Sequence, residues 1–124
     1  MRITPLVCLA TAGALICLPD AEAHHGWAEF DLNREVTIEG TVTDFHFVNP
    51  HCVVEFDAKE HNGSIRKWQG EFSSPGALKR RGWNEASLQP GDPVKIVGNP
   101  AKGDVPAIHV LRIRMPGAEE VSVD

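Results

Sequence analysis

The chain has 124 residues, with 12 basic and 17 acidic side chains, and its formal net charge is −5 at neutral pH. A chain of this length suits one small domain with its own hydrophobic core. The acidic balance argues against a nucleic-acid or anionic-membrane partner, because either would require a basic surface.

Residues 1–23 have the pattern of an export signal. Arg2 is followed by an apolar run over residues 5–18 and by the small-residue pattern Ala-Glu-Ala at residues 21–23. The apolar run is too short to span a bilayer, and no stop-transfer segment follows it. We therefore expect a cleaved signal peptide over 1–23, a single domain over 24–124, a periplasmic or secreted location, and no stable membrane insertion after cleavage.

The cysteines exclude a disulfide-built domain. Cys8 and Cys17 lie inside the expected signal peptide, so Cys52 is the single cysteine of residues 24–124. One cysteine cannot form an internal disulfide, and the domain must depend on its core. Because Cys52 alternates in phase with Val54 and Phe56, we expect a buried, inert thiol.

The first predicted strand covers residues 35–48 and changes face along its length. Apolar residues occupy even positions up to Val42, whereas from Phe45 onward they occupy odd positions. Since a slip of one residue exchanges the two faces of a strand, we expect a bulge near Thr43 to Asp44.

The remaining elements follow in a simple order. We expect a second strand over 51–58, an Asn62-Gly63 hairpin turn, and a third strand with Trp68 and Phe72. A short helix should start at Pro75, with Ser74 as its N-cap and Gly82 at its end. A turn at 90–92, a fourth strand from Pro93 and a fifth strand over 106–116 should follow. Residues before Arg34 and after Pro116 read as tails. This order predicts an all-β domain with one short helix, in the form of a small five-stranded OB-like barrel.

His24 would be the first residue after cleavage behind Ala23. Its free α-amine and imidazole would then form a bidentate chelate, and one further imidazole would complete a histidine brace for copper. Cleavage after Ala21 would instead put His24 third in the mature chain, which is also a copper-chelating arrangement. His25 is a weaker ligand candidate than His24.

The stretch "DFHFVNPH" supplies a second group of candidate ligands. If Asn49 and Pro50 formed a tight turn, His46 would face Val53, and His46 and His51 would be diagonal neighbours able to share an ion. Proline is disfavoured at the second central position of common turns, so this pairing is conditional. For His51 a ligand role and a structural role are both open, whereas the structural role is favoured for His46.

The other candidates have simpler interpretations. We expect a structural role for His109 and a solvated side chain for His61. The three tryptophans (Trp27, Trp68 and Trp83) either line a binding cleft or pack in the core. No nucleophile elbow, phosphate-binding glycine loop, CxxC pair or haem motif is present, so the sequence predicts no catalytic residue.

Four segments carry a family resemblance: "AHHGWAEFD", "EGTVTDFHFVNPH", "SSPGALKRRGW" and "SLQPGDPVKIVGNPAKG". They resemble a family of small exported bacterial proteins of unknown function, whose members have an Ala-His-His-x-Trp mature start, a Thr-Val-x-x-Phe-x-x-x-Asn-Pro-His segment and a Leu-x-Pro-Gly-Asp turn. The resemblance covers residues from His24 to about Met115 and points to no characterised enzyme. Its shared elements are His24, His25 and Trp27; Asn49, Pro50 and His51; Gly82 and Trp83; and Pro90, Gly91 and Asp92.

Three hypotheses follow for the function. The first is a periplasmic metal-binding protein, for a copper ion, with His24 and His51 as principal ligands and His25 or His46 as a third. The second is a non-metal domain that binds a small molecule or a periplasmic protein partner. The third is a copper-dependent oxidoreductase, for which the sequence identifies no substrate cleft.

Overall fold

The structure is a computed structural model, and it describes residues 27–124. Within these residues no helix is long and apolar enough to cross a membrane. A single cluster of buried side chains forms the core, and its largest fully buried members are Phe56, Phe72, Leu78, Leu88 and Ile96.

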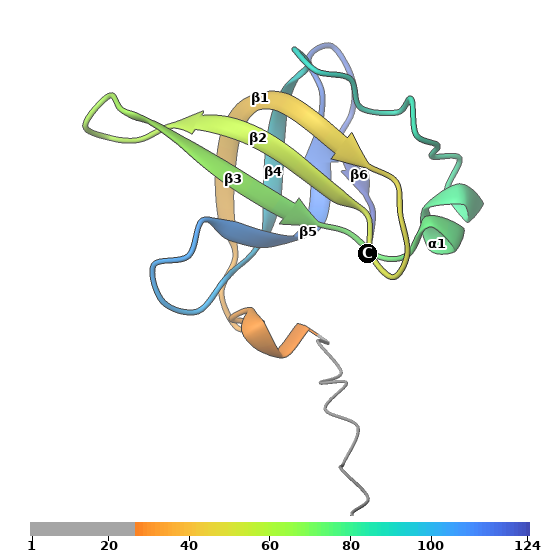
Figure 1. Cartoon of the computed structure of the whole chain (residues 1–124), viewed down its shortest axis with the longest axis horizontal. Coiled ribbons are helices and arrows are strands. Elements are labelled where there is room, and N and C mark those ends of the chain that lie inside the picture. Colours follow the sequence, from red (N-terminus) through yellow and green to blue (C-terminus); the bar gives the residue numbers. More distant parts are fainter. Residues whose placement is uncertain (1–26) are drawn as a thin grey trace, which may run out of the picture.

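The elements follow the expected order, with two additions at the ends. They are the 3-10 turn η1 (Trp27–Glu29), β1 (Val36–His46), β2 (Val53–Lys59), β3 (Ile65–Glu71), α1 (Pro75–Arg80), β4 (Pro93–Pro100), β5 (Ala107–Arg114) and β6 (Val121–Ser122). Figure 1 shows the strands wrapped around one another, with α1 at the right, on the connection from β3 to β4, and the orange η1 segment leading into β1.

The sheet closes into a five-stranded barrel. Its strand order is β3-β2-β1-β4-β5-β6, and a parallel pairing of β3 with β5 joins the two sides. All other pairings are antiparallel. Closure removes the open edges that a sheet would otherwise expose, and this small all-β barrel is the predicted fold.

The predicted face change in the first strand is confirmed. Val42 pairs with Phe56 and Asp44 pairs with Glu55, so Thr43 is the extra residue of a bulge. Beyond the bulge, His46 lies opposite Val53, as predicted, although β1 and β2 are joined by six residues rather than by a tight turn.

The predicted helix boundaries are also confirmed. The Ser74 hydroxyl accepts a hydrogen bond from the Ala77 N–H at 3.2 Å, and Pro75 occupies the first turn. After Arg80 the chain turns at Gly82, whose φ of +86° is in the left-handed region that favours glycine.

The C-terminal segment differs from the prediction of a tail. Ser122 pairs with Arg112 and Val121 pairs with Ile113, forming a sixth strand beside β5. The Val123 side chain is buried in the core, and its N–H donates to the Leu111 carbonyl at 2.9 Å. A two-residue strand is too short for alternation to reveal it. Together with the buried Val123, it fixes the position of Asp124.

Candidate functional site

The barrel brings residues from all five of its strands into one row, and those of β1, β3, β4 and β5 are polar. In the pairing of β1 with β2, His46 lies opposite Val53, and in the pairing of β2 with β3, Val53 lies opposite Glu71. Across the parallel contact, Glu71 lies opposite His109 of β5, which in turn lies opposite Asn99 of β4. Paired residues of neighbouring strands project to the same side of a sheet. Because the residues adjacent to Glu71 and His109 along their strands are buried in the core, this row lies on the outer face of the barrel.

His51 lies at the end of the β1–β2 loop and contacts this row through Glu71. Its Nδ1 is 2.6 Å from Glu71 Oε1, and both side chains are about three-quarters buried, with exposed fractions of 27% and 29%. An ionised carboxylate can only accept a hydrogen bond, so Nδ1 carries the proton of the neutral ring. The Nε2 lone pair of His51 is then available to a ligand.

His109 is the most deeply buried titratable side chain of the row, with an exposed fraction of 3%. Asn99 Nδ2 donates to the Arg34 carbonyl at 2.8 Å, which turns Asn99 Oδ1 toward His109 Nδ1 at 3.3 Å. Because an amide oxygen only accepts, the His109 proton is assigned to Nδ1 and the lone pair to Nε2. Burial lowers the pKa of His109, against the opposing influence of Asp124 and Glu71.

His109 Nε2 lacks a hydrogen bond within the described part of the chain. Asp124 Oδ1 lies 3.3 Å from this nitrogen, within ion-pair distance, and Asp124 raises the pKa of His109 against the effect of burial. Asp124 is positioned by β6 and by Arg81, whose guanidinium donates to the Asp124 carbonyl oxygen. The result is a buried nitrogen lone pair beside a carboxylate.

Trp27 covers this region by stacking on both histidines. Its ring centroid is 3.7 Å from that of His109 and 4.9 Å from that of His51, with interplanar angles of 19° and 21°. The segment around Trp27 is anchored because Phe30 is buried and bridges to Ala101. Lys102 adds two hydrogen bonds, from its N–H to the Glu29 carbonyl and from Nζ to the Ala28 carbonyl.

His46 belongs to a separate, exposed cluster. Its Nε2 is 3.3 Å from Glu55 Oε2 and 3.5 Å from Asp44 Oδ2. Among residues 27–124, these three side chains form the one group of three or more potential ligands whose atoms lie within 4.8 Å of one another. His51 is not a member, so the structure joins His51 to Glu71 and His46 to Asp44 and Glu55.

The other candidate residues have distinct positions. His24 and His25 lie outside the described residues. His61 is exposed at the β2–β3 hairpin, and Cys52 is fully buried, as predicted. Trp68 stacks on Phe56, and Trp83 packs on Phe45 and Phe72, so both support the core.

Two residues of the site, Glu71 and Asp124, were not predicted from the sequence. Glu71 is separated from His51 by 20 positions, and Asp124 falls in the segment read as a tail. Neither contact follows from local spacing. The parallel β3–β5 pairing is the feature that brings Glu71 beside His109, and the sequence gives no direct signal for that pairing.

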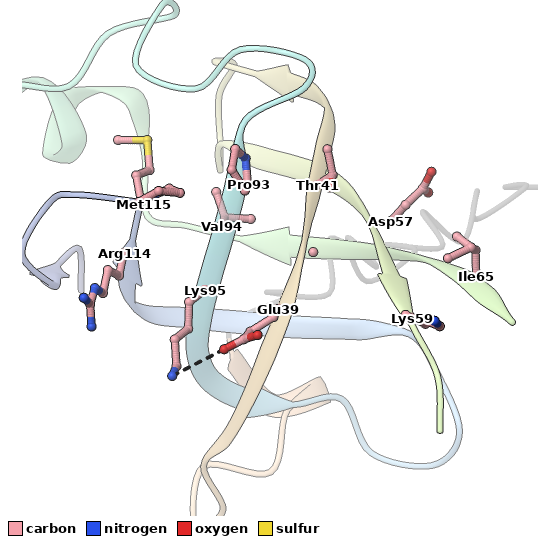
Figure 2. Close-up of a pocket in the computed structure, with 12 residues that line it drawn as sticks. Glu39, Thr41, Asp57, Lys59, Ile65, Pro93, Val94, Lys95, Arg114 and Met115 are labelled. Atoms are coloured by element: carbon pink, nitrogen blue, oxygen red, sulfur yellow. Dashed lines mark ion pairs between the residues drawn. The ribbon is translucent and has the colours of Figure 1, made fainter. Parts of the chain in front are cut away.

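A groove lies elsewhere, over β1, β2, β4 and the end of β5. Figure 2 shows its rim, where Lys95 Nζ and Glu39 Oε1 form an ion pair at 3.4 Å. The groove has a volume of about 710 Å³, and its apolar wall includes Ile65, Val94 and Met115. None of the three tryptophans lines it.

The fold and the site define a small closed β-barrel with a histidine–carboxylate row under a tryptophan. The chain belongs to a family of unknown function, DUF6152, whose model matches residues 13–108. No curated protein matches the sequence.

Two solved structures are similar in fold. One is the crystal structure of TiaS in complex with an isoleucine tRNA and ATP, with 20% identity and a TM-score of 0.52 over 74% of this chain and 20% of that chain. The other is TiaS in complex with the same tRNA, AMPCPP and agmatine, with 20% identity and a TM-score of 0.50 over 74% of this chain and 21% of that chain. The chain thus spans about a fifth of the length of these structures, and the likeness concerns the fold alone.

Proposed function

We propose that this protein is an exported metal-binding protein, for a copper ion, with His24 and His51 as principal ligands. The observation that carries the proposal is the 2.6 Å contact of His51 Nδ1 with Glu71 Oε1. Histidines that bind metals almost always donate their other ring N–H to a carboxylate, carbonyl or water, which fixes the tautomer and the ring orientation. His51 has this arrangement, and its Nε2 is the ligand atom.

The covalent chain supports the participation of His24. Three peptide units separate His24 from Trp27, and consecutive Cα atoms are 3.80 Å apart, so the two Cα atoms are at most about 11 Å apart. Trp27 itself stacks on His51. An N-terminus created by cleavage after Ala23 is therefore within reach of the His51 ring.

Copper is the proposed ion because the donors are nitrogens. An α-amine and two imidazoles suit Cu(II), which stands highest in the affinity order of divalent first-row metals. Export through the signal peptide over residues 1–23 is part of the proposal, since the amine exists only after cleavage. The third ligand, His25 or His46, remains a prediction, and sequestration, delivery or sensing of the ion are the corresponding roles.

The experiment is a Cu(II) titration of the exported protein, with mass spectrometry of its N-terminus on the same sample. We expect stoichiometric binding that quenches the fluorescence of Trp27, and a loss of at least about tenfold in affinity for His51→Gln. His61→Gln, an equivalent change at the exposed hairpin, is the control. A chain that starts at His24 and binds no copper would overturn the proposal.

A second candidate function is the binding of an amphipathic small molecule in the groove of Figure 2. Its apolar wall, with Lys95 and Arg114 at the rim, is the observation that favours this function. Thr41→Trp, at an exposed position of the lining, would fill the groove and abolish such binding, whereas His51→Gln would leave it unchanged. Binding to each variant is measured as the rise in melting temperature when the small molecule is added. An equal rise in the two variants would contradict a groove site.

A further inference from the structure

We infer that the groove of Figure 2 binds a single-chain anionic amphiphile whose head group is held by Arg114, an inference that deepens the second candidate function and rests on it. The groove volume of about 710 Å³ is in the usual range for small-molecule sites. Figure 2 shows Arg114 and Met115 at one end of the groove and Lys59 and Ile65 at the other. A ligand that fills it is therefore extended, with one end at Arg114.

The Arg114 end of the groove carries surplus positive charge. Lys95 lies opposite Glu39 in the pairing of β1 with β4, and opposite Arg114 in the pairing of β4 with β5. Lys95 Nζ forms an ion pair with Glu39 Oε1 at 3.4 Å, whereas Arg114 has no ion pair within residues 27–124. Like charges directly opposite each other on neighbouring strands destabilise a sheet. An anion bound to Arg114 would relieve the repulsion between Arg114 and Lys95.

Arg114 suits an anionic head group better than Lys59 does, although Lys59 also lacks an ion pair in the described part of the chain. The planar guanidinium of arginine presents a fork of N–H donors that matches a carboxylate or a phosphate, whereas the ammonium of lysine is a strongly hydrated point charge. Asp57, two positions before Lys59, also lines the groove and would repel an anion there. The head group is therefore assigned to the Arg114 end.

The lining between the two ends fits a hydrocarbon tail. Met115 and Val94 continue the wall from Arg114, and Ile65 closes it at the far end with an exposed fraction of 64%. A hydrocarbon chain laid along this wall removes its own apolar surface and that of Ile65 from water, which favours binding. A cation at one end and an apolar wall behind it together select an amphiphile with one anionic head group.

The test is isothermal titration calorimetry of the exported protein with four amphiphiles, each below the concentration at which it forms micelles. Dodecanoate and dodecyl phosphate carry anionic head groups, dodecyl maltoside carries a neutral one, and dodecyltrimethylammonium carries a cationic one. The variants are Arg114→Gln, Lys59→Gln and the groove-filling Thr41→Trp. Arg80→Gln, an equal change of charge on the exposed side of α1, is the control, and circular dichroism checks each fold.

We expect the anionic amphiphiles to bind at least about tenfold more tightly than the other two. Arg114→Gln should weaken their binding by at least about tenfold, the usual effect of losing a hydrogen bond to a charged group, and Lys59→Gln should weaken it less. Arg80→Gln should retain the wild-type affinity. Binding of only one of the two anions supports the inference and identifies the head group as a carboxylate or a phosphate.

Two further results separate this inference from the function on which it rests. If Thr41→Trp abolishes binding but all head groups bind equally, or if the Arg114 and Lys59 variants lose affinity equally, the inference is overturned and the second candidate function stands. If no amphiphile binds, or if Thr41→Trp leaves binding unchanged, both are overturned.

Discussion

His51 Nδ1 lies 2.6 Å from Glu71 Oε1, although the two residues are 20 positions apart and belong to different elements. This pair fixes the tautomer of the ring that the proposed function requires. We predict that Glu71→Gln lowers copper affinity by about 10–100-fold, the usual cost of losing a carboxylate partner of a metal-bound histidine. The measurement is a competition titration against a chelator of known affinity.

Glu39→Gln is the matched control for this change. Glu39 is also a carboxylate of the barrel surface, and it pairs at 3.4 Å with Lys95, which is not a candidate ligand. Surface ion pairs contribute only about 0–1 kcal/mol. Equal losses of affinity in the Glu39 and Glu71 variants would contradict a specific role for Glu71.

Local patterns in the sequence were sufficient to predict the strands of the barrel, but not to predict which residues meet at the candidate site. Alternation and parity located the bulge at Thr43, and capping residues located the helix, because these depend on neighbours in sequence. Alternation also puts His109 on the outer face, opposite to Ile108 and Val110, where a polar residue is normally solvated. Its burial comes from Trp27, 82 positions away, a contact that no local pattern encodes.

The stability of the metal-free protein should depend on the protonation of His109. Burial lowers its native pKa below the ordinary value of 6.5, so between these two values the unfolded chain binds more protons than the native chain. The contribution of His109 to stability is therefore complete above pH 6.5 and is lost as the pH falls through the lower native pKa. Urea unfolding between about pH 7.5 and 5 measures this loss.

His109→Gln should flatten this pH dependence, because glutamine does not titrate. Asp124, Glu71 and His51 also influence His109, so their presence in every sample keeps the comparison matched. His61→Gln, at an exposed position, should retain the wild-type slope. The same slope in the His109 variant and in the wild type would refute the assignment.

The Cys52 thiol should be unreactive in the folded protein. Its side chain is fully buried, and burial raises its pKa despite a hydrogen bond with the Val48 backbone that lowers it, so little reactive thiolate forms. In a chain that starts at His24, an aromatic disulfide reagent should label no thiol under native conditions and one thiol after unfolding. Rapid labelling of the native chain would show that Cys52 is accessible through local opening.

Gly98→Ala should destabilise the barrel at the point where it supports His109. A Cβ at Gly98 would overlap the His109 carbonyl oxygen, and that backbone atom cannot move without displacing β4 from β5. We expect a loss of about 1–3 kcal/mol in the free energy of unfolding, the usual range for overpacking, measured by urea denaturation.

Gly76→Ala should increase the free energy of unfolding. Gly76 lies in α1, and its added Cβ would meet no atom closer than 3.7 Å. Alanine is favoured over glycine within a helix by about 1 kcal/mol, so this variant should be stabilised. A Gly98 variant with wild-type stability would show that the β4–β5 contact yields to the added methyl group.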